Sequence, residues 1–356
     1  MVGNTLANFT GVNGKTLITG HSGFKGTWMT LLLEKLGVEV IGLSLPPEEG
    51  SLFQRCGRAG AIQEKFLDIR NFEGIQEFLS LHKPTNIIHM AAQPLVLESY
   101  RSPRATFETN VLGTVNLLDA AFGSDSTKNI VVLTTDKVYR NDNLGNRFVE
   151  SDPLGGKDPY SASKVGTESV VTAWQQIHKV SGGPKIISVR AGNVIGGGDW
   201  ASDRLLPDLV RGFIDGSPIK IRNSESTRPW QHVLDPLVGY LLALAHISEG
   251  GDEEVFNFGP DKNSLTVREV VRISKEVWPG KSEIEFIPIV KGLESEKLDL
   301  DSTLVAKVLG WYPVFTQEES IRKTFQWWQK VLLDSKDPQK ACFEDIDFML
   351  SKLRAV

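Results

Sequence analysis

The stretch that decides the fold is Lys15-Thr16-Leu17-Ile18-Thr19-Gly20-His21-Ser22-Gly23-Phe24-Lys25-Gly26. Its first five residues are typical of a buried strand, and a helical pattern over Trp28 to Leu36 follows the last glycine. The spacing G-x-x-G-x-x-G permits a tight turn and lets the backbone approach a pyrophosphate closely. Free N–H groups at the start of the following helix would face that anion. The stretch therefore predicts a dinucleotide-binding loop; the alternative is a tight turn without a ligand. The expected cofactor contacts of this loop are Gly20, Ser22, Gly23, Phe24, Lys25 and Gly26.

Further apolar runs of strand length alternate with helical patterns over the first part of the chain. These runs are Val38–Ser44, Asn86–Met90, Ile130–Thr134 and Ile186–Arg190. Because they are nearly continuous rather than alternating, helices should cover both faces of the sheet. The pattern predicts an α/β fold with a Rossmann-type, doubly wound parallel sheet.

The pattern changes near residue 195. Gly196-Gly197-Gly198 is expected to be a flexible break, and the short strands Ile219–Arg222 and Glu285–Ile287 then lie among helices. We expect a dinucleotide-binding domain over residues 1–195 and a smaller α/β substrate lobe over residues 196–356, with the chain free to cross between them.

Composition excludes several classes of protein. The chain has 356 residues, and 39 Lys plus Arg against 44 Asp plus Glu give a net charge of −5. A mildly acidic chain without a dense basic run is not expected to bind nucleic acid. No apolar run approaches the ~18 residues of a membrane span, and the first residues do not resemble a secretory signal. Two cysteines cannot build a disulfide framework or a four-cysteine zinc site, so we expect a reducing cytoplasm and no metal.

The adenosine end of the cofactor site is less well defined by the sequence. The second strand ends Ile41-Gly42-Leu43-Ser44-Leu45-Pro46, without the acidic residue that commonly binds a ribose. Ser44 is the expected ribose contact, whereas Lys25 would suit a 2′-phosphate, so this strand does not separate NAD from NADP. Asp68 and Ile69 suit an adenine contact, although a simple strand-end turn fits them equally well.

Tyr160-Ser161-Ala162-Ser163-Lys164 opens a helical stretch, and residues four apart share one helix face. A cation about 4 Å from the phenol, at an effective dielectric of ~20, would be worth about 4 kcal/mol and would lower the tyrosine pKa. The pair then predicts a tyrosinate that accepts a proton from a substrate hydroxyl. The alternative is an ordinary surface pair.

These motifs, with His89-Met90-Ala91-Ala92-Gln93, Thr109–Thr114 and Arg190–Asn193, resemble the extended short-chain dehydrogenase/reductase superfamily over nearly the whole chain. The resemblance implies bound NAD, with Ala91, Ala92, Gln93 and Thr134 beside it together with Tyr160 and Lys164. It also implies a nucleotide-diphosphate sugar as substrate.

Thr134-Thr135-Asp136-Lys137-Val138-Tyr139 ends a strand and is similar to the 4,6-dehydratase branch that acts on CDP-glucose. That resemblance assigns Thr135 to the sugar oxygen, Asp136 as the acid for the C6 hydroxyl and Lys137 as the C5 base. In a regular strand Asp136 would point away from Thr135 and Lys137, so the strand must end or bend there. A solvated Asp-Lys strand end is the alternative.

The same resemblance suggests the substrate contacts and the assembly. Asn193, Arg204, Arg222, Arg228 and Glu294 are the expected contacts for the nucleotide-sugar. Helices near Arg104–Ala121 and Ser161–His178 are expected to pair with a second copy in a helix bundle, as a homodimer or homotetramer. A sugar-nucleotide 4-epimerase, a dehydratase for another nucleotide and a non-catalytic dinucleotide sensor remain as alternatives.

Overall fold

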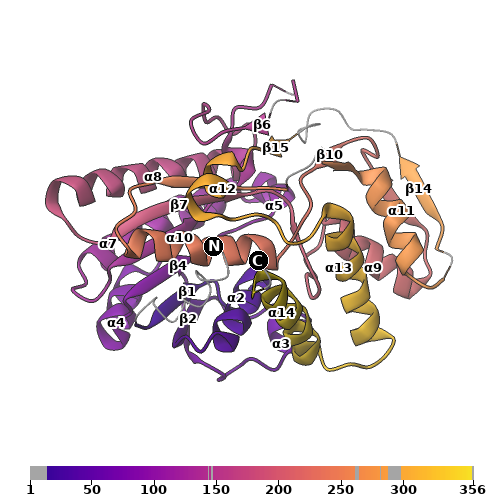
Figure 1. Ribbon diagram of the computed structural model, residues 1–356, viewed down its shortest axis with the longest axis horizontal. Helices are drawn as coiled ribbons and strands as arrows, with labels where there is room; N and C mark the ends of the chain where they lie inside the picture. Colours follow the sequence, from indigo (N-terminus) through magenta and orange to yellow (C-terminus); the bar gives the residue numbers. More distant parts are fainter. Residues whose placement is uncertain are drawn as a thin grey trace.

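The computed structural model describes residues 14–142, 144–145, 147–260, 264–280, 282–287 and 298–354. Its centre is a seven-stranded sheet in the order β12-β7-β5-β4-β1-β2-β3, in which every neighbouring pair is parallel (Figure 1). The prediction of a doubly wound, Rossmann-type α/β fold is confirmed. The strands of this sheet are β1 (Thr16–Thr19), β2 (Val40–Ser44), β3 (Gln63–Phe66), β4 (Asn86–His89), β5 (Asn129–Leu133), β7 (Lys185–Ala191) and β12 (Val255–Phe258).

Successive residues of the strands enter two different cores, one on each face of the sheet. Ile18 packs with α2 (Phe24–Lys35) and α10 (Leu234–Ser248), whereas Leu17 packs with α4 (Phe72–His82) and α7 (Gly113–Phe122). Complete burial of such a side chain stabilises the fold by about 1.5–3 kcal/mol, so both faces contribute. This double burial explains why the strand sequences are almost wholly apolar.

The local sequence explains where the two helices that flank the site begin. Helix α2 begins at Phe24, four residues before the predicted start, because the glycine loop itself turns into the first helical turn; Gly37, at φ +72°, follows its end. Helix α8 (Pro159–Ser181) begins with a proline, and the Asp158 side chain accepts a 2.9 Å hydrogen bond from the Ser161 amide. This cap fixes the first turn of α8, which carries Tyr160.

The stretch expected to be one helix near Arg104–Ala121 is helical but interrupted. It consists of α6 (Pro103–Phe107), a π-helical turn η2 (Glu108–Leu112) and α7.

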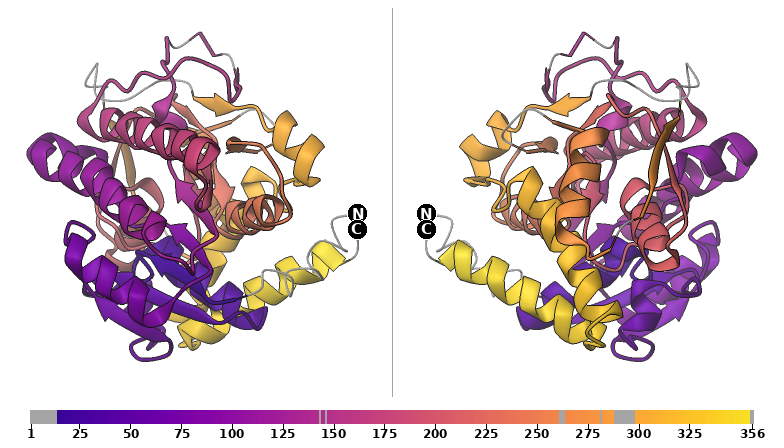
Figure 2. Two further views of the ribbon diagram at one scale, coloured as in Figure 1. Left: turned by 90° about the vertical axis from the view of Figure 1, so that its left-hand side faces the viewer. Right: turned by 90° about the vertical axis from the view of Figure 1, so that its right-hand side faces the viewer.

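The remaining elements lie outside the main sheet, and Figure 1 shows α9, α11, α13 and β14 gathered on the right-hand side. Strands β9 and β14 pair in parallel, as do β8 with β11 and β6 with β15, whereas β10 and β13 are antiparallel. Helix α14 runs outward from the body towards the C-terminus (Figure 2). Their bounds are α3 (Leu52–Arg55), α5 (Val96–Arg101), η3 (Asp136–Val138), β6 (Arg147–Phe148), β8 (Val194–Ile195), α9 (Leu205–Asp215), β9 (Ile219–Arg222), β10 (Thr227–Arg228), β11 (Gln231–His232), β13 (Leu265–Thr266), α11 (Val267–Val277), β14 (Ile284–Ile287), β15 (Asp299–Leu300), α12 (Thr303–Leu309), α13 (Gln317–Leu332) and α14 (Pro338–Arg354).

The expectation that Gly196-Gly197-Gly198 is a flexible break is wrong. All three glycines are buried, and a Cβ on Gly197 would lie 2.0 Å from the Trp327 ring. A Cβ on Gly198 would lie 2.3 Å from Leu52, and the Gly197 carbonyl accepts a 3.0 Å hydrogen bond from the Trp28 indole. Glycine is therefore needed here for close packing between α13, α2 and α3, not for mobility.

Candidate active site

Most of the predicted site residues gather at the carboxyl ends of the central strands, where the sheet order reverses between β1 and β4. The glycine loop follows β1, Ala91–Gln93 follows β4 and Thr134–Lys137 follows β5. Open parallel sheets bind ligands at this position, because the loops at neighbouring strand ends diverge there.

The glycine loop has the geometry of a pyrophosphate cradle. Gly20 has φ +73°, and a Cβ there would lie 2.9 Å from the Ala91 backbone. A Cβ on Gly26 would lie 2.1 Å from the Gly20 carbonyl oxygen. Among the described residues, no side chain caps α2 at Gly23, so the first N–H groups of the helix remain available to an anion. The residues present therefore fit a dinucleotide cofactor.

The residues predicted at the adenosine end are engaged with one another. The buried Ser44 hydroxyl lies within hydrogen-bond distance of Ser22 Oγ, at 2.8 Å, and of the Leu45 carbonyl oxygen, at 2.9 Å. The Asp68 carboxylate forms an ion pair with Arg70 at 2.6 Å, and the Ile69 side chain is buried. A ribose or adenine contact by Ser44 or Asp68 would have to share these bonds.

The segment after β4 is held in place by hydrogen bonds from its backbone amides to side chains. The amide of Ala91 donates to the Thr19 hydroxyl at 3.2 Å, and the amide of Gln93 donates to Asn110 Oδ1 at 2.8 Å. Ala91, Ala92 and Gln93 are all half-buried. This places the three residues along the wall between the glycine loop and the turn after β5.

Lys25 acts towards the catalytic end of the site rather than the adenosine end. Burial lowers the pKa of its ammonium to about 8; Arg204 lowers it further, while Asp136 and Asp199 oppose the shift. It also contributes to lowering the pKa of Lys164. The charged groups that act on Lys25 therefore belong to the cluster around Asp136, and its pairing with a ribose 2′-phosphate stays a prediction.

Strand β5 ends at Leu133, and the chain turns sharply through Thr135 into the 3₁₀ turn η3. The Thr135 hydroxyl donates to Asp136 Oδ1 at 2.9 Å, and Lys137 Nζ lies 4.0 Å from the same carboxylate. Asp136 is buried, and its Oδ2 atom has no hydrogen-bond partner among the described residues. The bend that these side chains require in order to meet is thus present, and it leaves one buried carboxyl oxygen available.

Tyr160 lies against that turn. Burial raises the pKa of the Tyr160 phenol to about 12, and its hydrogen bond with Thr135 opposes the shift in part. Asp136, Arg204 and Asp158 also act on this phenol.

Lys164 makes a hydrogen bond to the backbone at the end of β5, and its electrostatic pairing with Tyr160 stays a prediction. The Lys164 ammonium donates to the Leu133 carbonyl at 3.1 Å. Burial and then Lys25 lower the pKa of Lys164 to about 7, with Glu168 acting in the opposite direction. The two side chains share a helix face, but the lysine is turned towards the end of β5.

The predicted substrate residues do not all meet. Arg204 joins the cluster: it forms a 3.0 Å ion pair with the buried Asp199 and acts on Tyr160. Arg228 is buried and lines one cavity together with Lys137. Asn193 is half-buried beside β8, and its carbonyl accepts from the Gln231 amide at 3.0 Å.

Two other predicted substrate residues cannot be placed at the cluster. Arg222 is exposed at the end of β9 and faces Asp208 of α9. Glu294 lies outside the described residues.

Sequence reasoning missed several polar residues of this site. Asp199 directly follows Gly196-Gly197-Gly198, and its ion pair with Arg204 was not predicted from the sequence. Lys157 and Asp158 line the cavity with Lys137 and Arg228, and their place directly before the Tyr160 helix was the available signal. Within the described ranges, no group of three or more His, Cys, Asp or Glu side chains is arranged to hold a metal ion.

The fold and the site together identify the class of protein. Residues 16–259 match the profile of the NAD dependent epimerase/dehydratase family, so the chain belongs to this NAD-binding family. It is 38% identical over 322 residues to a CDP-glucose 4,6-dehydratase of Salmonella typhimurium, covering 88% of this chain and 90% of that protein.

Solved structures of related enzymes have the same fold. A UDP-glucose 4-epimerase of Thermus thermophilus in complex with NAD aligns with a TM-score of 0.77 at 26% identity, covering 88% of this chain and 98% of that one. A dTDP-glucose 4,6-dehydratase of Bacillus anthracis in complex with NAD aligns with a TM-score of 0.76 at 23% identity, covering 90% and 97%. The second likeness, at this identity, concerns the fold alone.

Proposed function

We propose that the protein is a nucleotide-sugar 4,6-dehydratase that converts CDP-D-glucose to CDP-4-keto-6-deoxy-D-glucose and water. The observation that carries this proposal is the turn after β5. It places a buried carboxyl with an available oxygen, Asp136, beside an amine, Lys137, within the environment of Tyr160. Elimination across C5 and C6 requires an acid and a base, and here they lie next to a tyrosine placed to accept the proton of the C4 hydroxyl.

The first step is oxidation at C4. Tyr160 accepts the proton of the 4-hydroxyl, and Thr135, whose hydroxyl acts on the Tyr160 phenol, orients the same oxygen. Bound NAD supplies the hydride acceptor at C4 and the hydride donor at C6, so the cycle has no net redox change. The high pKa of Tyr160 means that added positive charge is needed to favour its proton-accepting form.

The second step is loss of water. The 4-ketone acidifies the C5 proton, which Lys137 removes, while Asp136 protonates the departing C6 hydroxyl. Return of the hydride to C6 and of a proton to C5 then gives the 4-keto-6-deoxy sugar. Both groups lie on one short turn, and their separation of 4.0 Å suits neighbouring carbons of one sugar. The buried position of Asp136 excludes water from the proton that it transfers.

The choice of CDP is supported by the 38% identical relative and by the arginines near the cluster. Arg204 and Arg228 are proposed to bind the diphosphate, with Asn193 beside them, because guanidinium groups suit phosphate oxygens. A UDP-glucose 4-epimerase is the second candidate, supported by the 26% identical structure. It is less favoured, because exchange of configuration at C4 needs neither Asp136 nor Lys137.

Product analysis tests the proposal. The purified protein with NAD is incubated with CDP-, UDP-, dTDP- and GDP-glucose, and the sugar products are separated and identified. A 6-deoxy-4-keto sugar, formed most rapidly from CDP-glucose and without net consumption of NAD, is the expected result. A galactose epimer as product would replace the dehydratase with an epimerase. Reduced cofactor accumulating in step with product would indicate a simple dehydrogenase, and no turnover of any sugar would favour a dinucleotide sensor.

The proposed assembly is a homodimer or homotetramer through a helix bundle. A groove between α6 and η2 is lined by Pro103, Phe107, Val111 and Leu112 among others, and Phe107 and Leu112 are exposed. On α8, which packs against both elements, Ile177 and Val180 are exposed as well. A second copy would bury these apolar side chains. Light scattering of the wild type and a Leu112→Glu variant tests this, with dissociation of the variant expected.

We further propose a reducing cytoplasm as the compartment, supported by the free, buried thiols of Cys56 and Cys342. Over the ranges that the structure describes, no helix is both long enough and apolar enough to cross a membrane.

A further inference from the structure

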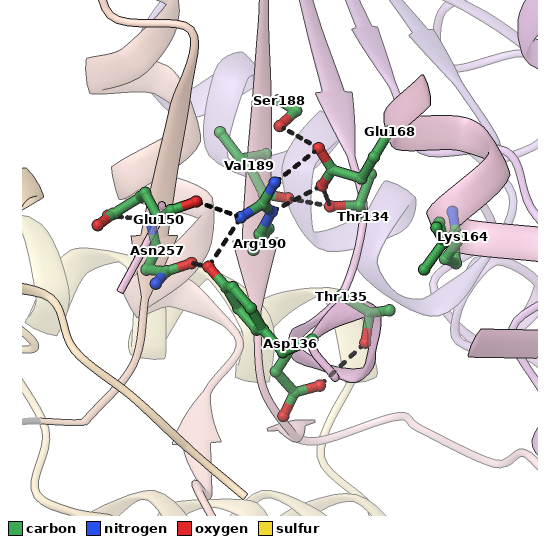
Figure 3. Close-up of polar contacts among 12 residues, drawn as sticks. Thr134, Thr135, Asp136, Glu150, Lys164, Glu168, Ser188, Val189, Arg190 and Asn257 are labelled. Carbon is green, nitrogen blue, oxygen red and sulfur yellow. Dashed lines mark hydrogen bonds and ion pairs between the residues drawn. The ribbon is translucent and has the colours of Figure 1, made fainter. Parts of the chain in front are cut away.

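A buried ion pair lies directly behind the candidate catalytic turn. Arg190 of β7 and Glu168 of α8 are both about 95% buried and are joined by two hydrogen bonds, Nε to Oε1 at 2.8 Å and Nη2 to Oε2 at 3.0 Å (Figure 3). The Glu168 carboxylate and its hydrogen bonds outweigh the effect of burial and raise the pKa of the Arg190 guanidinium. Burying two charges is costly unless every polar atom is satisfied, so the further partners of this pair are informative.

On one side the pair holds the residue that enters the turn. Glu168 accepts a 2.5 Å hydrogen bond from the hydroxyl of Thr134 and a 3.0 Å bond from the hydroxyl of Ser188. Thr134 directly precedes Thr135. Glu168 lies on α8, one helical turn after Lys164. Its bond with Thr134 therefore holds α8 against the end of β5 (Figure 3).

On the other side the pair holds the residue that leaves the turn. Arg190 Nη1 donates to the Tyr139 hydroxyl at 2.8 Å and to the Glu150 carbonyl at 3.0 Å. The Tyr139 hydroxyl in turn donates to Asn257 Oδ1 at 2.7 Å, and the guanidinium lies 5.0 Å from the centre of the Tyr139 ring. The two ends of the Thr135–Val138 segment are thus tied to one ion pair.

The turn has little to hold it from within. Apart from the 2.9 Å bond between the Thr135 and Asp136 side chains, the hydrogen bonds within the turn are donated by backbone amides and are long. They measure 3.3 Å from the Val138 amide to the Thr135 carbonyl, 3.3 Å from the Tyr139 amide to the Asp136 carbonyl, and 3.4 Å from the Lys137 amide to the Thr135 hydroxyl. Bonds of this length are weak compared with the usual ~2.9–3.0 Å. Beyond the turn, the Gly155 amide donates to the Val138 carbonyl at 2.8 Å, which holds the backbone but not the tyrosine ring.

We propose that the Glu168–Arg190 pair, acting through Thr134 and Tyr139, is a positioning device that holds Asp136 and Lys137 in register with the substrate for the elimination step. This inference rests on the proposed function. Thr134, Tyr139, Glu168 and Arg190 act as positioning residues, since each reaches the turn rather than the reacting carbons. Misplacing a reacting group by about 1 Å can cost on the order of 10²-fold in rate.

The variant that tests the proposal is Tyr139→Phe, which removes one hydroxyl and keeps the ring that stacks on Phe148 at 4.9 Å. Tyr312→Phe, at a residue 65% exposed, is the matched control. Two measurements are made on both variants and the wild type. Amide hydrogen exchange follows Lys137, Val138 and Tyr139 without substrate. Single-turnover experiments with CDP-glucose follow the absorbance of reduced nicotinamide, and mass spectrometry follows solvent deuterium at C5.

The expected result for Tyr139→Phe is faster exchange at those amides, oxidation at C4 close to the wild-type rate, and elimination slowed by at least about ten-fold. Glu168→Gln, which removes the charge and retains the shape, should slow the same step. Unchanged exchange, or equal slowing of oxidation and elimination, overturns the proposal, because the pair would then be an ordinary part of the core. The exchange measurement needs no substrate. It therefore tests whether the ion pair anchors the turn even if the wild-type protein forms no 6-deoxy sugar. Absence of that product would count against the proposed function and not against the anchoring.

Discussion

Asp235 is expected to make the stability of this protein fall as pH rises. It lies in the first turn of α10, and its carboxylate accepts a 2.7 Å hydrogen bond from the Val314 amide. The Oδ2 atom is buried without a partner among the described residues. Burial raises the pKa of the carboxyl from 3.8 to about 8, although the backbone amides of Val314 and Phe315 oppose the shift.

The sign and the size of the effect follow from proton linkage. Between about pH 4 and pH 8 the folded protein keeps a proton that the unfolded chain has released, so stability falls by about 1.4 kcal/mol per pH unit. The contribution is fully present below about pH 4 and is lost by about pH 8. At about pH 7 the loss reaches as much as about 4 kcal/mol, and favourable placement at a helix N-terminus reduces it.

Asp235→Asn removes the titration and keeps the acceptor oxygen for the Val314 amide. Thermal unfolding of the variant and the wild type at about pH 5 and about pH 8 should show a Tm advantage of the variant that grows with pH, by roughly 2 °C per kcal/mol. Asp215→Asn, at an exposed residue of α9, is the control and should show no such trend. A Tm difference that is the same at both pH values would refute the assignment of a protonated Asp235.

Three further predictions concern the site. Tyr160→Phe should fold normally and lose about 10²–10⁴-fold in turnover of CDP-glucose, since it removes the proton acceptor; near-normal turnover would exclude that role. Lys137→Met should allow oxidation at C4 but block elimination, so that absorbance of bound reduced nicotinamide builds up and deuterium does not enter C5; normal C5 exchange would assign the base elsewhere. Gly26→Ala should abolish NAD binding in calorimetry, because its Cβ would lie 2.1 Å from the Gly20 carbonyl oxygen; retained affinity would show that the loop can shift.

Local patterns predicted the parts of the site that depend on neighbouring residues. The glycine loop is a continuous stretch whose strand, turn and helix are all encoded within it. The bend at Thr135 could be anticipated, because a straight strand would separate the Asp136 side chain from those of its neighbours.

Features that depend on distant residues could not be predicted in this way. Gly196–Gly198 looks flexible in sequence, and only the fold brings Trp327 and Leu52 against it. The spacing of Tyr160 and Lys164 gives a common helix face, but it does not reveal the hydrogen bond from Lys164 to the Leu133 carbonyl. Glu168 and Arg190 are 22 residues apart on different elements, and the one local sign of their pairing is that Glu168 falls one helical turn after Lys164.

The position of β12 has a consequence for synthesis of the chain. This strand, Val255–Phe258, forms the outer edge of the main sheet beside β7. The side-chain oxygen of its Asn257 accepts a hydrogen bond from the Tyr139 hydroxyl. The nascent first half of the protein therefore leaves the ribosome with β7 as an unpaired edge, open to pairing with other chains. A shortened gene product ending near residue 195 would keep that edge permanently, and we expect it to be recovered as aggregate or bound to chaperones rather than as a free NAD-binding domain.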